Sequence, residues 1–162
     1  MRGKLGTAAL VVVAMLAVAA PALGIGEPPT DAEYVAAVEP ICKRDREATE
    51  RILKGARDNI NSGRLRVAGN QLIRASKRFG TTIRQLVAVP RPVAQEEKLQ
   101  KWFTFLRLVK TRLAATGKLY KEGKKLEATH ESIRAEKSGN AANNVSFSFG
   151  FRDCRMSRSR FS

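Results

Sequence analysis

Apolar residues recur at steps of three or four along most of the chain after residue 30, which is the spacing of one face of an α-helix. The clearest case lies over 64–87, where seven apolar positions are separated by polar ones: Leu65, Ala68, Leu72, Ala75, Phe79, Ile83 and Leu86. A stripe this narrow is typical of helices in antiparallel bundles. Gly69 and Gly80 lie within the helix and would allow another helix to approach closely. The pattern predicts an all-α fold.

Another helix is expected earlier in the chain, beginning at a capping box. Thr30 is followed three residues later by Glu33, and in such a pair each side chain accepts a hydrogen bond from an otherwise free backbone N–H. Apolar positions continue at helical steps as far as Ile60, and 59–63 (NINSG) has the composition of a helix end. Pro40 lies inside this run and is expected to kink the helix, because Pro removes one backbone hydrogen bond.

The most apolar stretch is WFTFLRLV, at 102–109, in a helix expected from Val93 to about 117–123. Six apolar residues share one face: Leu99, Trp102, Phe103, Leu106, Val109 and Leu113. Phe105 and Leu108 add a second face, so the stretch is too apolar for a helix with a single neighbour. We expect it to pack between two helices. The alternative is a patch in which Trp102, Phe105 and Leu108 contact another protein.

The last helix, expected over about 124–149, has a sparse apolar pattern of five positions: Leu126, Ile133, Ala141, Val145 and Phe149. Two alternatives stay open here, because 138–144 has the composition of a loop and the alternation over 145–151 also fits a strand. We favour a helix capped by Gly150 in a left-handed conformation, with Phe151 folding back. The sequence thus predicts an antiparallel bundle of about four helices over 25–155 and a basic disordered tail over 156–162.

The first 24 residues have the features of an export signal. Arg2 and Lys4 precede an uncharged, Ala-rich apolar run, and small residues near Ala22 offer a cleavage site. We therefore expect a signal peptide over 1–24 and a secreted or cell-envelope protein with no transmembrane span after the signal is removed. The alternative is an uncleaved N-terminal helix that anchors the protein in a membrane, since the uncharged run extends to Gly26.

Cys42 and Cys154 are the two cysteines of the chain. In an oxidising compartment an even number of cysteines favours disulfide bonds, so we expect one bond between them. It would close a loop of about 110 residues and fasten the first helix to the end of the last. The alternatives are two free thiols or an intermolecular bond.

Positive charge predominates, with 30 Lys and Arg against 15 Asp and Glu and a net charge of +15. A field of this sign favours anionic partners, which outside the cytoplasm are anionic lipids, wall polymers or acidic proteins. The alternative is that the charge serves solubility alone. Specific nucleic-acid binding is not expected, because the aromatic residues fall on the apolar faces and export separates the protein from nucleic acid.

The feature that most directly suggests a function is a row of basic residues on the helix over 64–87. Helical spacing places them on one face, away from the apolar stripe: Arg66, Arg74, Lys77 and Arg84, with Arg78 and Arg91 at its flanks. Such a row would bind an anionic surface, because each basic residue near a charged membrane contributes about 1 kcal/mol. The alternative interpretation is an ordinary solvated helix face.

Sequence motifs for catalysis, metal binding or cofactor binding do not occur. His130 is the single histidine, whereas a zincin helix needs two, as in H-E-x-x-H. C-x-x-C, G-x-S-x-G and G-x-x-x-x-G-K-[ST] are also missing. We therefore expect a protein that is not an enzyme and has neither metal nor cofactor, with His130 on a solvated helix face.

Several short features resemble a group of small, uncharacterised bacterial exported helical proteins: Tyr34-Val35, Ile41-Cys42, Asn140-Ala141-Ala142, Phe149-Gly150-Phe151 and Cys154. The resemblance implies a two-cysteine helical bundle and no known activity. Pro40 and the strong basic charge depart from it.

Three functional hypotheses follow from the sequence. The leading one is a noncatalytic exported or envelope protein that binds an anionic surface or partner through a basic helix face. The second is a structural or assembly protein that makes protein contacts through the apolar face over 102–109. The third is a carrier of a small apolar ligand inside the bundle. The oligomeric state is not predicted.

Overall fold

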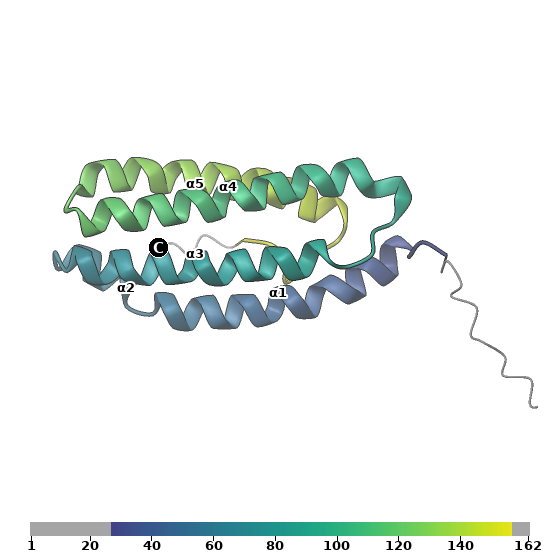
Figure 1. Ribbon diagram of the computed structural model, residues 1–162, viewed down its shortest axis with the longest axis horizontal. Helices are drawn as coiled ribbons and strands as arrows, with labels where there is room; N and C mark the ends of the chain where they lie inside the picture. Colours follow the sequence, from purple (N-terminus) through teal and green to yellow (C-terminus); the bar gives the residue numbers. More distant parts are fainter. Residues whose placement is uncertain (1–26, 157–162) are drawn as a thin grey trace, which may run out of the picture.

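The computed structural model describes residues 27–156. Within this range the helices follow one another as α1 (Asp31–Leu53), α2 (Ala56–Asn61), α3 (Leu65–Val87), the short 3-10 helix η1 (Val93–Gln95), α4 (Glu96–Lys121) and α5 (Lys125–Ser148). The four long helices alternate in direction, and the pair α4–α5 lies over the pair α1–α3 (Figure 1). The predicted antiparallel four-helix bundle is confirmed. The predicted signal peptide, over 1–24, lies outside the described residues.

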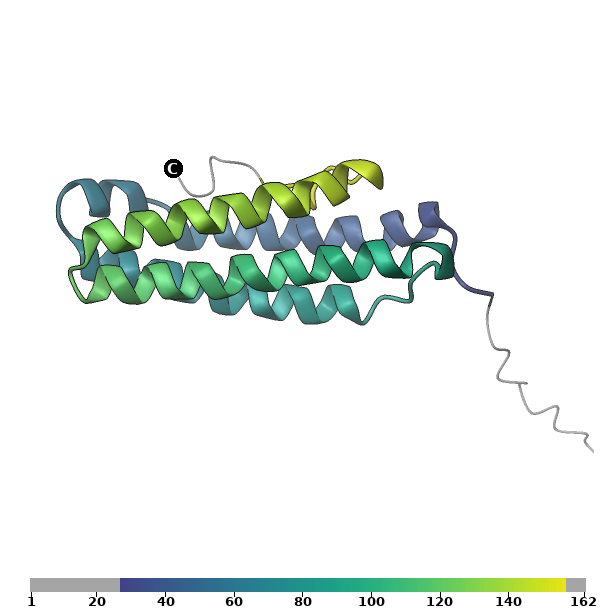
Figure 2. The ribbon, with the colours of Figure 1, turned by 90° about the horizontal axis from the view of Figure 1, so that it is seen from above.

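Helix α4 packs against both α3 and α5, and α3 packs against both α1 and α4. Seen from above, α4 and α5 form the nearer layer of the bundle (Figure 2). Helix α1 packs mainly on α3. The prediction that the apolar stretch 102–109 lies between two helices is confirmed.

Helix α1 begins at the predicted capping box. The Thr30 side chain accepts from the backbone N–H of Glu33 (3.2 Å), and the Glu33 carboxylate accepts from the backbone N–H of Thr30 (2.8 Å). The helix continues across Pro40. Pro40 and Ala36 are both exposed, so water can satisfy the Ala36 carbonyl that Pro40 leaves without a helical donor.

The expected extension of the first helix to Ile60 is wrong. Helix α1 ends at Leu53, because Gly55 adopts a left-handed conformation (φ 75°) that terminates the helix. The buried Gln71 side chain of α3 donates to the carbonyl oxygens of Ile52 (3.1 Å) and Lys54 (2.9 Å). The break is therefore stabilised from outside the helix, and the six-residue helix α2 follows it.

The last segment is helical, which excludes both the loop and the strand considered for it. Residues 138–144 are helical rather than a loop, and 145–148 continue the helix rather than form a strand. Gly150 has a φ of 73°, and the backbone N–H of Phe151 donates to the carbonyl of Ser146 (3.1 Å), so the predicted cap is confirmed. The inward face differs from the expectation: Leu126 and Ile133 are 67% and 47% exposed.

Small residues form the buried face of α5: Ala128, Ala135, Ser138, Gly139, Ala142 and Ser146. The hydroxyl groups of Ser138 and Ser146 donate to carbonyls four residues earlier, so their burial leaves no polar group unsatisfied. Small side chains let α5 lie close to α4, and its larger residues Leu126 and Ile133 lie on the outside.

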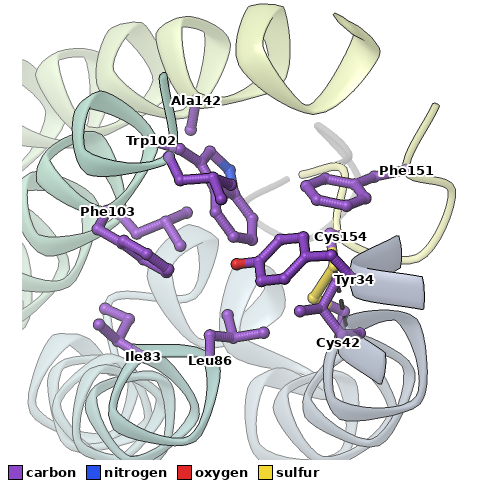
Figure 3. Close-up of a cluster of buried hydrophobic side chains, with 12 residues drawn as sticks. Tyr34, Cys42, Ile83, Leu86, Trp102, Phe103, Ala142, Phe151 and Cys154 are labelled. Carbon is purple, nitrogen blue, oxygen red and sulfur yellow. Dashed lines mark hydrogen bonds between the residues drawn. A yellow bond between two sulfur atoms is a disulfide. The ribbon is translucent and has the colours of Figure 1, made fainter. Parts of the chain in front are cut away.

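The main core combines aromatic and aliphatic side chains from all four long helices and from the segment after α5 (Figure 3). Trp102 is fully buried and packs against Phe103 and Phe151, with ring centroids 5.3 and 5.1 Å away. Tyr34 comes from α1 and is also fully buried. The hypothesis that Trp102 contacts another protein is therefore wrong, since its side chain has no exposed surface.

The chain after α5 turns back along the bundle and fills the space beside α1 (Figure 1). We call residues 151–156 the C-terminal strap. The Glu39 carboxylate accepts from the backbone N–H groups of Arg152 and Asp153, each at 2.9 Å. Asn143 of α5 bonds both the N–H and the C=O of Met156. Met156 is thus packed in the fold and does not begin a tail as predicted; residues after it lie outside the described range.

The predicted disulfide joins the strap to α1. Cys42 and Cys154 are bonded, with an S–S distance of 2.08 Å and a sequence separation of 112 residues. Both side chains are buried, 7% exposed. The bond fastens the first helix to the segment that follows the last, as expected.

Candidate functional site

The solvent face of α3 carries the predicted basic row. Arg66, Arg74, Lys77 and Arg84 are all exposed, and within residues 27–156 none of them forms an ion pair. Helix α3 contains no acidic residue at all. No acidic side chain of α3 therefore offsets the positive charge of these four residues.

Arg78 does not belong to this row. Its side chain faces α1, where its Nε lies 3.6 Å from the Asp45 carboxylate. Asp45 is 3% exposed and accepts a hydrogen bond from the Thr82 hydroxyl (2.6 Å). Arg78 pairs with a buried carboxylate between α1 and α3, which sets it apart from the exposed residues of the row.

Glycines in α3 let lysines of α4 reach the same surface. A β-carbon added to Gly80 would lie 3.3 Å from Cε of Lys110, and one added to Gly69 would lie 2.8 Å from Cγ of Lys121. The apolar stems of both lysines therefore cross over α3 where it has no side chain. Long basic side chains commonly bury their stems in this way and leave the ammonium group in water.

Two further cations of α4 lie beside these lysines. Arg107 and Lys118 precede Lys110 and Lys121 by three residues, which places them on adjoining parts of the helix surface, and both are exposed. We call these eight residues of α3 and α4 the basic face: Arg66, Arg74, Lys77, Arg84, Arg107, Lys110, Lys118 and Lys121.

Acidic residues are confined to the ends of α4. Glu97 is paired with Lys101 (2.7 Å), and the hydrogen bond from Lys101 lowers the pKa of Glu97. At the other end Glu122 is paired with Lys124 (2.8 Å), and that hydrogen bond lowers the pKa of Glu122. Residues 98–121 contain no acid. No acidic residue of α3 or of 98–121 therefore interrupts the basic face.

The apolar residues proposed for protein contact lie on the other flank of α4. Phe105 is half-buried and Leu108 is 39% exposed, whereas Trp102 is in the core. Phe105 and Leu108 form part of a shallow groove between α4 and α5.

Three hollows between the helices of the described residues 27–156 are small, with volumes of about 20, 10 and 40 Å³. Each holds about one or two waters at most. These hollows offer no support for the hypothesis of a carrier with an apolar ligand inside the bundle.

His130 is exposed on α5, as expected. Among residues 27–156, no group of three His, Cys, Asp or Glu side chains lies close enough to hold a metal ion. In the same range, no helix is long and apolar enough to cross a membrane. The disulfide fits an extracytoplasmic location, because such bonds persist in oxidising compartments.

Comparison of the chain with protein-family models, with curated proteins and with solved structures found no match. The resemblance to small exported bacterial two-cysteine proteins therefore stays a prediction.

Proposed function

We propose that this protein is a noncatalytic exported or envelope protein that binds an anionic surface through the basic face of α3 and α4. The observation that supports the proposal most directly is the crossing of Lys110 and Lys121 over Gly80 and Gly69. It adds the cations of a second helix to the row on α3. The N-terminal run over 5–20 and the disulfide support export.

An anionic lipid bilayer is the partner whose shape suits this face best. From Arg66 to Arg84 the row spans about 27 Å along α3 at 1.5 Å per residue, and α4 runs alongside it. A long, broad array matches a plane better than it matches one small ligand. The face carries few large apolar side chains, so binding would be electrostatic and would weaken as salt increases.

Co-sedimentation with vesicles tests the proposal. The probe is a mixture of phosphatidylcholine and phosphatidylglycerol, with pure phosphatidylcholine as the neutral control. The test variant is R66Q/R74Q/R84Q. The matched control is R44Q/R51Q/R57Q, which removes three exposed arginines from α1 and α2 and lowers the net charge equally.

The test variant should lower the partition coefficient by roughly a hundredfold, at about 1 kcal/mol for each charge, and the control should have a much smaller effect. Equal binding at low and high salt would overturn the proposal. So would an equal loss in both triple variants, because that result would assign binding to net charge rather than to this face.

An assembly role is less well supported. Its central residue, Trp102, is buried in the core, and the remaining apolar residues of that face, Phe105 and Leu108, line a small groove.

A further inference from the structure

A shallow groove of about 220 Å³ lies between α4 and α5, on the opposite flank of α4 from the basic face. Its floor is apolar and is made by Phe105, Leu108 and Ala141. Its rim is basic and is made by Arg112, Arg134 and Lys137. An apolar floor and a charged rim of one sign are thus combined in one place.

The groove exists because α5 is too small here to cover α4. Ser138 and Ala142 form the contact face of α5, and Ala141 lies beside them. None of these side chains is long enough to cover the ring of Phe105 or the side chain of Leu108. Leu108 is consequently 39% exposed, although its apolar surface would be more stable away from water.

Two of the three rim cations are paired with one carboxylate. Glu131 accepts hydrogen bonds from Arg112 and from Arg134, each at 3.2 Å, and its side chain is only 16% exposed. Arg134 remains 65% exposed, and Lys137 is exposed as well. The rim thus has three cations and one paired carboxylate, so it keeps a positive excess. Arg134 and Lys137 are its exposed cations.

We propose that this groove binds a single-chain anionic amphiphile. Its hydrocarbon chain would lie on Phe105 and Leu108, and its phosphate or carboxylate would pair with Arg134 and Lys137. Arginine and lysine form strong charge-assisted hydrogen bonds with both anions. The proposal is independent of the basic face, whose residues it does not use.

The size of the groove favours this occupant over a protein. Pockets that enclose drug-sized ligands have volumes of about 300–1,000 Å³. A groove of about 220 Å³ therefore covers part of one hydrocarbon chain and has no room for the two chains of a diacyl lipid. A stable protein interface needs roughly 800 Å² on each partner. A groove lined by a few side chains is far smaller than that.

Titration of the disulfide-bonded protein with dodecyl phosphate, below the concentration at which it forms micelles, tests this proposal. Isothermal calorimetry gives the Kd, and amide NMR shifts locate the ligand. Inorganic phosphate lacks the chain, and dodecyl maltoside lacks the charge. The variants are R134Q/K137Q for the head group and L108Q for the chain. The matched control R66Q/R84Q removes two charges from the basic face instead.

Dodecyl phosphate should bind with one-to-one stoichiometry and shift the amides of Phe105, Leu108 and Ala141. R134Q/K137Q should raise the Kd at least about tenfold, L108Q about threefold, and R66Q/R84Q less than about twofold. Because all these side chains are exposed, circular dichroism should show unchanged folding.

Four results would overturn the proposal: no saturable binding, equal binding of inorganic phosphate, a larger loss in R66Q/R84Q than in R134Q/K137Q, or binding of an acidic amphipathic peptide in this groove without binding of dodecyl phosphate. The vesicle experiment with R66Q/R74Q/R84Q has a separate outcome, so failure of either proposal is distinguishable from failure of the other.

Discussion

Gly69 of α3 and Gly117 of α4 lie backbone to backbone at the point where the two helices cross. A β-carbon added to Gly117 would lie 2.7 Å from the carbonyl oxygen of Gly69 and 2.8 Å from Cγ1 of Ile73. Real β-carbons essentially never come this close to such atoms. The distance between α3 and α4, and with it the continuity of the basic face, depends on these two glycines.

Gly117→Ala is therefore expected to destabilise the protein by about 1–3 kcal/mol, the usual cost of overpacking. Alanine gains about 1 kcal/mol in helix propensity, but a clash with backbone atoms outweighs that gain. Chemical denaturation would measure the effect. An unchanged or increased unfolding free energy would show that the helices do not cross as closely as described.

Gly80→Ala is the contrasting case on the same interface. The nearest atom to an added β-carbon is Cε of Lys110, at 3.3 Å, and a lysine side chain can move by that small amount. The propensity gain of up to about 1 kcal/mol then dominates, so the variant should be as stable as the parent or more stable. A loss as large as that of Gly117→Ala would contradict this comparison.

Cys154→Ser should loosen the C-terminal region before it affects α3 and α4. The bond closes a loop with a separation of 112 residues, for which chain-entropy arithmetic predicts about 4–5 kcal/mol of stabilisation. Without it, the strap is held by Glu39, Arg46 and Asn143. Hydrogen exchange should show reduced protection over 125–156 first.

Cys42→Ser provides the control for this prediction, because it breaks the same bond from α1 and should give the same exchange pattern. Adding Glu39→Ala to Cys154→Ser should expose the strap further, since it removes the acceptor for the Arg152 and Asp153 N–H groups. Uniform loss of protection in all four long helices would mean that the bond stabilises the whole fold equally.

Local patterns were sufficient to predict much of the fold. The steps of three and four in α3, the Thr30–Glu33 box and the Gly150 cap each depend on neighbours in sequence, and all are confirmed. The break at Gly55 could have been anticipated from Lys54-Gly55, a common helix-end signal. Its stabilisation by Gln71, from another helix, could not.

The hydrophobic pattern could not predict the environment of residues that is set by how neighbouring helices pack. Hydropathy favours Leu126 and Ile133 as inward positions, yet α5 packs through small residues and leaves both outside. In the sequence, nothing distinguishes Arg78 from the other arginines of α3. It differs from them because it pairs with Asp45 of α1, a contact that exists only in the folded structure. Lys110 and Lys121 join the basic face only because particular glycines of α3 lie beneath them.

The hydroxyl group of Tyr34 is buried and has no hydrogen-bond partner among the described residues. Burial raises the pKa of Tyr34 from 10.0 to about 12, because the phenolate cannot be solvated in the aromatic core. In the unfolded chain the group ionises at its ordinary pKa. The folded state is therefore favoured fully below pH 10.0, and this contribution is lost as the pH rises through about 12.

Tyr34→Phe removes both the unsatisfied hydroxyl and this pH dependence. At neutral pH the variant should be as stable as the parent or more stable by about 1 kcal/mol, because no hydrogen bond is lost and a buried polar group disappears. Between pH 10.0 and about 12 the parent should lose stability relative to the variant. Denaturation of both proteins across this range measures the difference. A constant difference would show that Tyr34 ionises equally in the folded and unfolded states, and a destabilised variant at neutral pH would reveal a partner for the hydroxyl.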